Sequence, residues 1–316
     1  MSDNLKTYTW LIGAGNMGIE YAKVLSSQNI KFDVIGRGEN SAKLFEENTG
    51  IKPIIGGIEK TSHLETPRYA IVAVNVEELA NTAIKLVQRG VKRILVEKPA
   101  GINANEINLL NETALKYGTE IIVAYNRRFY ASTIKAKELI VLDGGVTSYT
   151  FEFTEWAHSV LNSNHPNIVL NNWFLANSTH VVDLAFFLGG LPVSMNSYTA
   201  NKLNWHSIAV FTGAGYCTNG ALFSYHANWD APGRWGVEIL TKKHRLIFRP
   251  IEKLQILELN SVTLYDASEV DYSLDQQFKP GLYRQVTAFY NDDKNLLSIH
   301  EHIKSLHFYE QILTGK

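Results

Sequence analysis

The strongest constraint on the fold is a glycine-rich loop that opens a repeating pattern of apolar runs and helical stretches. The loop, Gly13-Ala14-Gly15-Asn16-Met17-Gly18, follows the apolar run 8–12. After it, Met17, Tyr21, Val24 and Leu25 fall on one face of a helix. The sequence therefore predicts a strand, a glycine turn and a helix, in that order.

The same alternation continues to about residue 124. Apolar runs at 31–35, 69–74, 93–96 and 120–124 alternate with helical stretches, of which one ends at Gly90 and another begins at a capping box formed by Asn103 and Glu106. Parallel strands need crossover connections, so this order predicts a parallel sheet with helices on both faces. We expect residues 1–124 to form a Rossmann dinucleotide-binding domain.

Beyond residue 125 the periodicity changes to that of half-buried strands. Residues 149–154 alternate apolar and polar side chains. Helices are expected at 178–188, before Gly189-Gly190, and at 299–313. We expect residues 125–316 to form an α+β domain for substrate binding and oligomerisation, built on an open, predominantly antiparallel sheet. Further strand-like runs lie around 208–211, 221–229, 237–241, 246–248 and 254–259, and the basic run 242–245 between two of them is interpreted as a solvated hairpin turn.

The glycine loop has the spacing of a dinucleotide site. Glycines at this position permit a tight turn and bring the backbone close to a pyrophosphate, whose charge meets the N–H groups of the helix N-terminus. A glycine turn that only lets strand and helix pack is the alternative. The residues expected at the cofactor are Gly13, Gly15, Asn16, Met17 and Gly18, with Gly36, Arg37, Asn75, Glu97 and Lys98 at later strand ends.

The end of the second apolar run favours NADP over NAD. An NAD site usually places a carboxylate there for the ribose 2′-hydroxyl. Here the run ends at Gly36-Arg37, which removes the repulsion of a 2′-phosphate and supplies a guanidinium for it. Arg37 as an ordinary solvated side chain, or Asp33 as the acid, is the alternative. NAD remains the second choice.

Composition excludes several classes of function. Lys and Arg number 30 against 31 Asp and Glu, so no global field gathers nucleic acid or a membrane surface. Cys217 is the one cysteine, which suits a reducing compartment, and residues 1–7 are polar. We expect a cytoplasmic protein without a targeting segment. His300 and His302 are two apart and point to different helix faces, so no metal is expected.

Four motifs in order along nearly the whole chain resemble one family. The sequence resembles the Gfo/Idh/MocA family, which includes glucose-fructose oxidoreductase and inositol dehydrogenase. The resemblance implies an NAD(P)-dependent dehydrogenase or reductase acting on CH–OH groups of a sugar, cyclitol or nucleotide sugar, and a homodimer or homotetramer formed through the C-terminal sheet. The motifs are Gly13 to Gly18, Glu97-Lys98-Pro99, Asn126-Arg127-Arg128-Phe129 and His180-x-x-Asp183.

Lys98 is the expected catalytic residue at the hydride-transfer site. Oxidation of a hydroxyl requires removal of its proton as hydride leaves for the nicotinamide. Burial and the positive nicotinamide ring both lower a lysine's pKa towards neutrality, which suits this task. The resemblance implies that this lysine pairs with the substrate hydroxyl and that its bond to Pro99 is often cis. A surface lysine after a strand is the alternative.

His180 is the second expected catalytic residue, as general acid/base or hydrogen-bond donor. Asn177, His180 and Asp183 are three apart on a predicted helix and so share a face. By resemblance, family members often carry Asp four residues before this histidine, where this chain has Ala176. Proton handling is then left to Lys98 and His180, with Asn177 and Asp183 as substrate ligands. A packed His180 and a structural Asp183 are the alternatives.

Further substrate contacts are expected from Asn126, Arg128 and Trp173. The first two leave the last strand of the parallel sheet, where ligands bind, although an ion pair between the domains explains an arginine equally well. Core packing is the alternative for Trp173. Two other functions stay open: an NAD-dependent glycosidase of this fold and a dinucleotide-binding regulator without turnover.

Overall fold

The computed structural model describes residues 8–316, and the polar start at residues 1–7 lies outside the described residues. The chain divides into two compact units. The first runs up to Asn126 and includes Leu274–Ile303, while the second comprises Arg127–Ser273 and Lys304–Lys316. The sequence predicted a single boundary near residue 125, whereas the chain returns to the first unit after residue 273.

The first unit contains the predicted parallel sheet. Its strand order is β15-β6-β5-β4-β1-β2-β3, and neighbouring strands are parallel except that β15 runs antiparallel to β6. The Rossmann prediction is confirmed, and β15 is an addition from the returning segment. The strands are β1 (Thr9–Ile12), β2 (Phe32–Gly36), β3 (Ile54–Ile55), β4 (Tyr69–Val72), β5 (Arg93–Glu97), β6 (Glu120–Ala124) and β15 (Leu297–Ser298).

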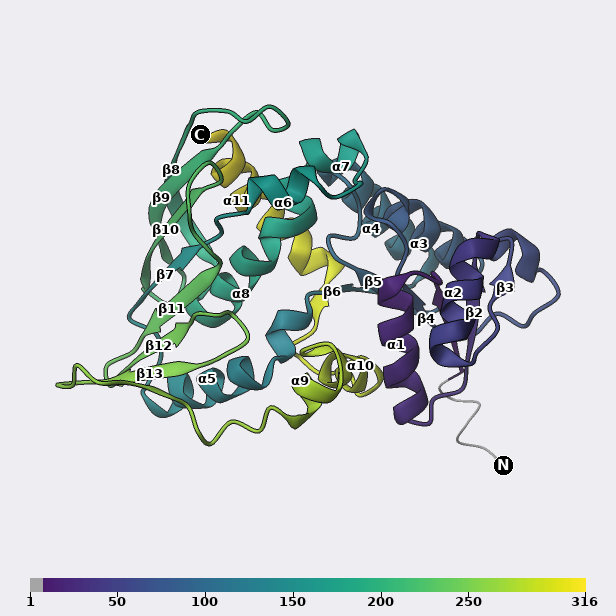
Figure 1. The fold of residues 1–316 in the computed structure, drawn as a ribbon, viewed down its shortest axis with the longest axis horizontal. Coiled ribbons are helices and arrows are strands. Elements are labelled where there is room, and N and C mark those ends of the chain that lie inside the picture. Colours follow the sequence, from purple (N-terminus) through teal and green to yellow (C-terminus); the bar gives the residue numbers. More distant parts are fainter. Residues whose placement is uncertain (1–7) are drawn as a thin grey trace. The chain divides into compact units, whose positions relative to one another are not determined.

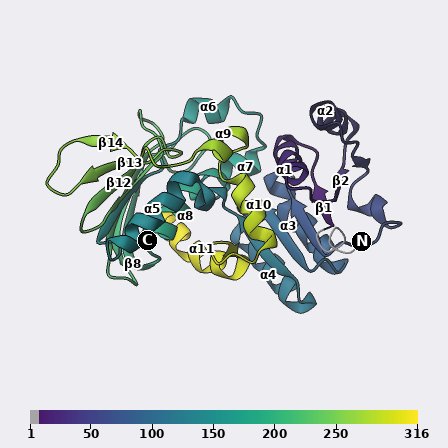
Figure 2. The ribbon, with the colours of Figure 1, turned by 90° about the horizontal axis from the view of Figure 1, so that it is seen from below.

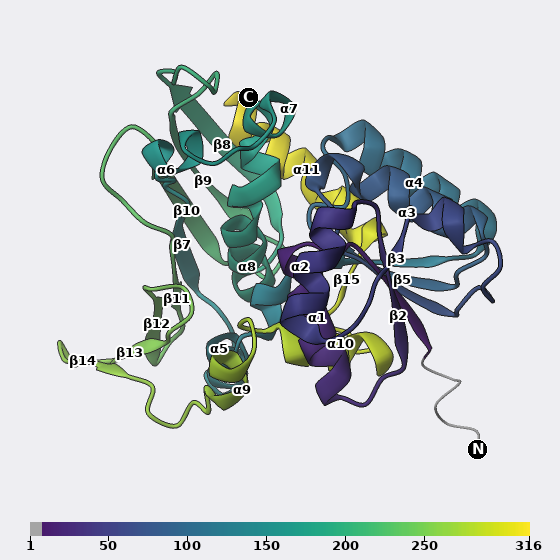
Figure 3. The same cartoon turned by 45° about the vertical axis from the view of Figure 1, so that its right-hand side comes forward.

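Helices cover both faces of this sheet, as a parallel sheet requires. Helices α3 and α4 lie together on one face, and α1, α2 and α10 lie on the other (Figure 3). The sequence did not predict α10, in which Leu282, Val286 and Phe289 are fully buried. The helices are α1 (Asn16–Ser27), α2 (Glu39–Thr49), α3 (Leu79–Gln88), α4 (Ala104–Tyr117), α9 (Ser273–Gln277) and α10 (Leu282–Tyr290), with short 3-10 turns at η1 (Ile58–Thr61), η2 (Val76–Glu78) and η3 (Asn126–Phe129).

The second unit is built on a sheet in the order β14-β13-β12-β11-β7-β10-β9-β8. Its neighbours are antiparallel except β7 and β10, which are parallel. The predominantly antiparallel prediction is therefore confirmed. The strands are β7 (Ser148–Glu152), β8 (Pro192–Ala200), β9 (Val210–Cys217), β10 (Leu222–Asn228), β11 (Gly236–Leu240), β12 (His244–Phe248), β13 (Gln255–Glu258) and β14 (Leu264–Asp266).

Helices α5 and α8 lie on one side of this sheet (Figures 1 and 2). Alternation along β10 buries Phe223, Tyr225 and Ala227 and exposes the residues between them. Helix α5 was not predicted, because its apolar residues do not gather on one helical face. The helices are α5 (Ala131–Leu142), α6 (Ala157–Leu161), α7 (Asn167–Asn171), the π-helical turn η4 (Phe174–Ser178), α8 (Thr179–Gly189) and α11 (Ile299–Thr314), which begins in the first unit.

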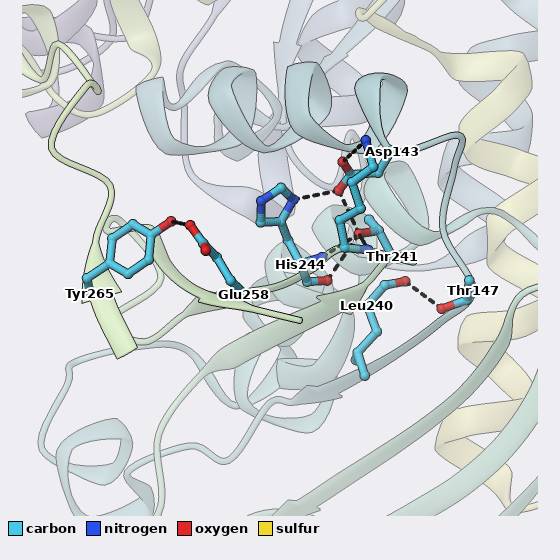
Figure 4. Close-up of polar contacts among 8 residues, drawn as sticks. Asp143, Thr147, Leu240, Thr241, His244, Glu258 and Tyr265 are labelled. Carbon is cyan, nitrogen blue, oxygen red and sulfur yellow. Dashed lines mark hydrogen bonds and ion pairs between the residues drawn. The ribbon is translucent and has the colours of Figure 1, made fainter. Parts of the chain in front are cut away.

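The turn between β11 and β12 comprises residues 241–243, so the basic run 242–245 covers part of the turn and the start of β12. A buried carboxylate anchors that turn (Figure 4). Thr241 Oγ1 and His244 Nδ1 each donate to Asp143 Oδ2 over 2.7 Å. Burial on its own would raise the pKa of Asp143, but these hydrogen bonds outweigh it and hold the pKa below its usual value. The turn is thus tied to the end of α5.

Within residues 8–316, no helix is long and apolar enough to cross a membrane. In the same residues, no three His, Cys, Asp or Glu side chains gather in a way that could hold a metal ion.

Candidate active site

The glycine loop between β1 and α1 combines close packing with one open position. A Cβ on Gly13 would lie 2.3 Å from the carbonyl oxygen of Ala73, and one on Gly18 would lie 2.0 Å from that of Gly13. These two glycines are required by backbone packing. A Cβ on Gly15 would meet nothing within 4 Å. The middle of the loop therefore presents bare backbone to open space, as close approach of a pyrophosphate requires.

The N-terminus of α1 is suited to an anion. Gly15 is its N-cap and supplies no side-chain hydrogen bond, and the first turn contains no acidic residue. Both Gly15 and Asn16 are exposed. The first N–H groups of a helix lack partners inside the helix and carry a partial positive charge. The residues present thus fit the pyrophosphate of a dinucleotide.

The end of β2 has the predicted residues but also an unpredicted partner. Gly36 ends the strand, and Arg37 donates to both carboxylate oxygens of Glu78, over 3.4 and 2.9 Å. Hydrogen bonding by Arg37 lowers the pKa of Glu78. Asp33 is the second residue of β2 and accepts a hydrogen bond from Tyr8. Asp33 is thus not at the strand end, and Arg37 is paired with a carboxylate.

The end of β5 forms a compact turn that contains Lys98. The amide of Ala100 donates to the carbonyl of Glu97 over 3.0 Å, and the Lys98–Pro99 bond is cis. Ala100 is fully buried with φ +74°, a left-handed conformation that is uncommon for a residue with a side chain. His302, buried on α11, contributes Nε2 at 3.1 Å from the Pro99 carbonyl oxygen. The backbone on both sides of Lys98 is therefore fixed.

Glu97 is held by a buried tyrosine. Tyr21 on α1 is fully buried, and its hydroxyl donates to Glu97 Oε1 over 2.7 Å. Removal from water raises the pKa of Glu97, although the hydrogen bond from Tyr21 and the positive charges of Lys98 and Lys279 oppose the shift. The carboxyl group thus links α1 to the last residue of β5, directly before Lys98.

The other predicted residues of the first unit have structural partners. Asn75 follows β4 and caps η2, and its amide is 3.4 Å from Glu77 Oε1. Asn126 is buried and donates to the carbonyl of Pro280 over 2.9 Å. Neither contact tests their predicted roles towards cofactor and substrate.

In the second unit, His180 and Asp183 are both buried on α8. The His180 ring is 6.3 Å from the Trp235 ring, centroid to centroid. Asp183 accepts two hydrogen bonds from Arg128, over 2.8 and 2.6 Å, and is only 2% exposed. Two predicted substrate ligands are therefore bound to each other. Their ion pair lies within the second unit, and it does not tie the two units together.

Asn177 lies in the π-helical turn and is held by a residue that sequence reasoning missed. Its Nδ2 is 3.1 Å from each carboxylate oxygen of Glu155, and Ser178 Oγ donates to Glu155 Oε1 over 2.6 Å. Glu155 lies in the loop after β7, and only its position beyond a strand end could have drawn attention to it. Ala176, which replaces the usual acid, is buried in the same turn.

Trp173 precedes this turn and packs in an aromatic cluster. It is 8% exposed, and its ring is 5.3 Å from that of His165 and 6.3 Å from that of Trp205. Trp156 is more accessible, with Arg234 4.4 Å above its ring. Core packing thus accounts for Trp173, and its contact with substrate stays a prediction.

Comparison with known proteins identifies the first domain. Residues 9–125 match the family model GFO_IDH_MocA, described as an oxidoreductase family with an NAD-binding Rossmann fold. None of the curated proteins matches the chain. The strand order, the glycine loop and this match together indicate an NAD(P)-binding domain of the oxidoreductase class. Residues 9–125 are thus similar to the Gfo/Idh/MocA family, as the motifs in that part of the chain predicted.

Solved structures extend the similarity of fold to both units. An oxidoreductase from Agrobacterium radiobacter, in complex with NAD+, L-tartaric acid and magnesium, is 14% identical with a TM-score of 0.79, over 98% of this chain and 96% of that one. A putative NADPH-dependent oxidoreductase from Desulfitobacterium hafniense is 17% identical with a TM-score of 0.78, over 99% and 96%. The WlbA dehydrogenase from Chromobacterium violaceum, in complex with NADH and UDP-GlcNAcA, is 16% identical with a TM-score of 0.74, over 100% and 94%.

Proposed function

We propose that the protein is an NAD(P)-dependent dehydrogenase or reductase that moves a hydride between the nicotinamide and a secondary carbinol or ketone carbon. The substrate is a sugar, a cyclitol or a nucleotide sugar. The observation that carries the proposal is the position of Lys98, which lies in a hydrogen-bonded turn directly after β5. Strand β1 belongs to the same sheet, and the helix that follows it, α1, offers an anion site at its N-terminus. A nucleotide sugar bound to a protein of the same fold agrees with this substrate class.

The proton chemistry is assigned to Lys98 and His180. The bound nicotinamide supplies the hydride acceptor or donor. In the oxidation direction, the neutral amine of Lys98 accepts the hydroxyl proton as the C–H bond breaks with its electron pair. In the reduction direction, the ammonium returns that proton to the developing alkoxide. His180 donates a hydrogen bond to the reacting oxygen or exchanges the proton with it.

The end of β2 supports NADP as the preferred cofactor. Gly36 offers no carboxylate, and Asp33 is engaged with Tyr8 inside the strand. Arg37 is exposed and would bind a 2′-phosphate in place of Glu78. The 2′-phosphate of the cofactor and the carboxylate of Glu78 compete for Arg37. We expect the phosphate to win this competition, so NADPH should bind at least about tenfold more tightly than NADH. Equal affinities in a fluorescence titration would contradict this preference.

A dimer or tetramer is proposed through the open face of the second sheet. Tyr198 is 68% exposed and Leu222 is 63% exposed on strands β8 and β10. Apolar side chains on a broad sheet face favour association with a second copy. Light scattering after size-exclusion chromatography measures this directly, and a monomer at micromolar concentration would contradict it.

The enzymatic proposal is tested by absorbance of the reduced nicotinamide in the near ultraviolet. D-glucose, myo-inositol, UDP-N-acetylglucosamine and UDP-GlcNAcA are each supplied with NAD+ and with NADP+, and the reverse reaction is run where a ketone is at hand. Turnover must change this absorbance. Release of free sugar without a change in absorbance would indicate a glycosidase, and dinucleotide binding without any turnover would indicate a regulator.

A further inference from the structure

Glu155 and the π-helical turn Phe174–Ser178 form a hydrogen-bonded unit next to the helix of His180. Glu155 is 6% exposed, so its carboxylate is held away from bulk solvent. It accepts from Asn177 Nδ2 through both oxygens, at 3.1 Å each, and from Ser178 Oγ at 2.6 Å. Buried carboxylates need such donors, because an unsatisfied charge is costly to bury. The turn and the loop after β7 are therefore fixed to each other.

The carboxylate determines which way the Asn177 amide points. Both oxygens of Glu155 accept from Asn177 Nδ2, so the NH2 group of Asn177 faces Glu155. The carbonyl Oδ1 then points away from Glu155. Among the residues the structure describes, Glu155 accounts for every hydrogen bond of the Asn177 side chain. Asn177 is half-buried, which leaves Oδ1 as an acceptor for a ligand.

The location of this acceptor matches a substrate contact. Asn177 precedes His180 by three residues, at the junction of the π turn with α8. π-Helical turns occur frequently at functional sites. One residue earlier, Ala176 has no polar group, and of the two polar residues in the turn, Asn177 and Ser178, Ser178 is buried and Asn177 is only half-buried.

We propose that Glu155 is a positioning residue that locks the Asn177 amide with Oδ1 towards bound carbohydrate. Asn177 then accepts a hydrogen bond from a substrate hydroxyl and selects a donor at that position over a ketone or an ether. This inference rests on the proposed function, because it assumes that a carbohydrate binds beside His180.

The test replaces the carboxylate of residue 155 by an amide, first alone and then together with the reverse replacement at residue 177. In Glu155→Gln, the residue at 155 offers Asn177 one acceptor and one donor instead of two acceptors, so it no longer holds the Asn177 NH2 inwards and Asn177 also presents that NH2 to the substrate. We expect KM for the carbohydrate that the wild type oxidises to rise about tenfold, with a smaller change in kcat and unchanged dinucleotide affinity. In the double variant E155Q/N177D, the Gln NH2 donates to the Asp carboxylate, which again presents an acceptor. KM should return to within about threefold of the wild type.

Ser178→Ala is the matched control. It removes a donor to the same buried carboxylate without affecting the orientation of Asn177, so the melting temperature should fall while KM stays within about twofold. Turnover by the wild-type protein separates failure of this inference from failure of the proposed function. If the wild type oxidises one of the four carbohydrates and E155Q keeps its KM, this inference alone is wrong. If the wild type oxidises none of them, the proposed function fails and this inference fails with it.

Discussion

The two units fix their candidate catalytic residues in different ways. Lys98 follows β5 directly, and the backbone on either side of it is held by the Ala100–Glu97 hydrogen bond and by His302 at the Pro99 carbonyl. His180 is the second residue of α8, and the polar residues near it in sequence are held by side chains from distant segments, Arg128 and Glu155. The first arrangement depends on the strand and its turn. The second depends on buried charges, so it is more sensitive to single substitutions.

Replacement of Lys98 should give the largest effect on activity and the smallest on structure. Lys98→Met keeps the length of the side chain and removes the group that handles the proton. We expect kcat to fall by about 10² to 10⁴ fold while the dinucleotide still binds, as measured by the absorbance assay and by fluorescence titration. Lys43→Met, on the exposed side of α2 in the first unit, is the control that removes a positive charge without affecting turnover. Full turnover by K98M would show that the catalytic assignment is wrong.

Replacement of Arg128 should have its main effect on the stability of the fold. Arg128→Met leaves the Asp183 carboxylate, 2% exposed, without its bidentate partner. Breaking a buried pair in this way costs about 3 to 5 kcal/mol of unfolding free energy. Denaturant unfolding of the full-length variant and of the wild type measures this loss of unfolding free energy.

The double variant R128M/D183L is the control for the Arg128 prediction. It removes both charges and should recover most of the lost stability, because no buried charge is left unpaired. If R128M is as stable as the wild type, the Arg128–Asp183 ion pair does not stabilise the fold.

The same difference explains how much could be predicted from the sequence. The glycine loop, the strand ends and Lys98 lie in local patterns, in which a turn or a helix start follows from adjacent residues. The contacts of Asp143 with His244, and of Glu155 with Asn177, join residues far apart in the chain, and no spacing indicates them. Helix α5 was missed because its apolar residues do not gather on one face, and Val141 and Leu142 are exposed.

The smallest expected effect is on the choice between the two dinucleotides, because Arg37 and Glu78 are partly solvated. Arg37→Ala should lower the NADPH to NADH affinity ratio by about tenfold, since the 2′-phosphate loses its guanidinium. Glu78→Gln should raise the ratio by about threefold, since it releases Arg37 from a competing carboxylate. Fluorescence titration with both cofactors measures the two ratios. If both variants shift the ratio in the same direction, Glu78 and the 2′-phosphate do not compete for Arg37, and the cofactor preference must come from other residues of the loop.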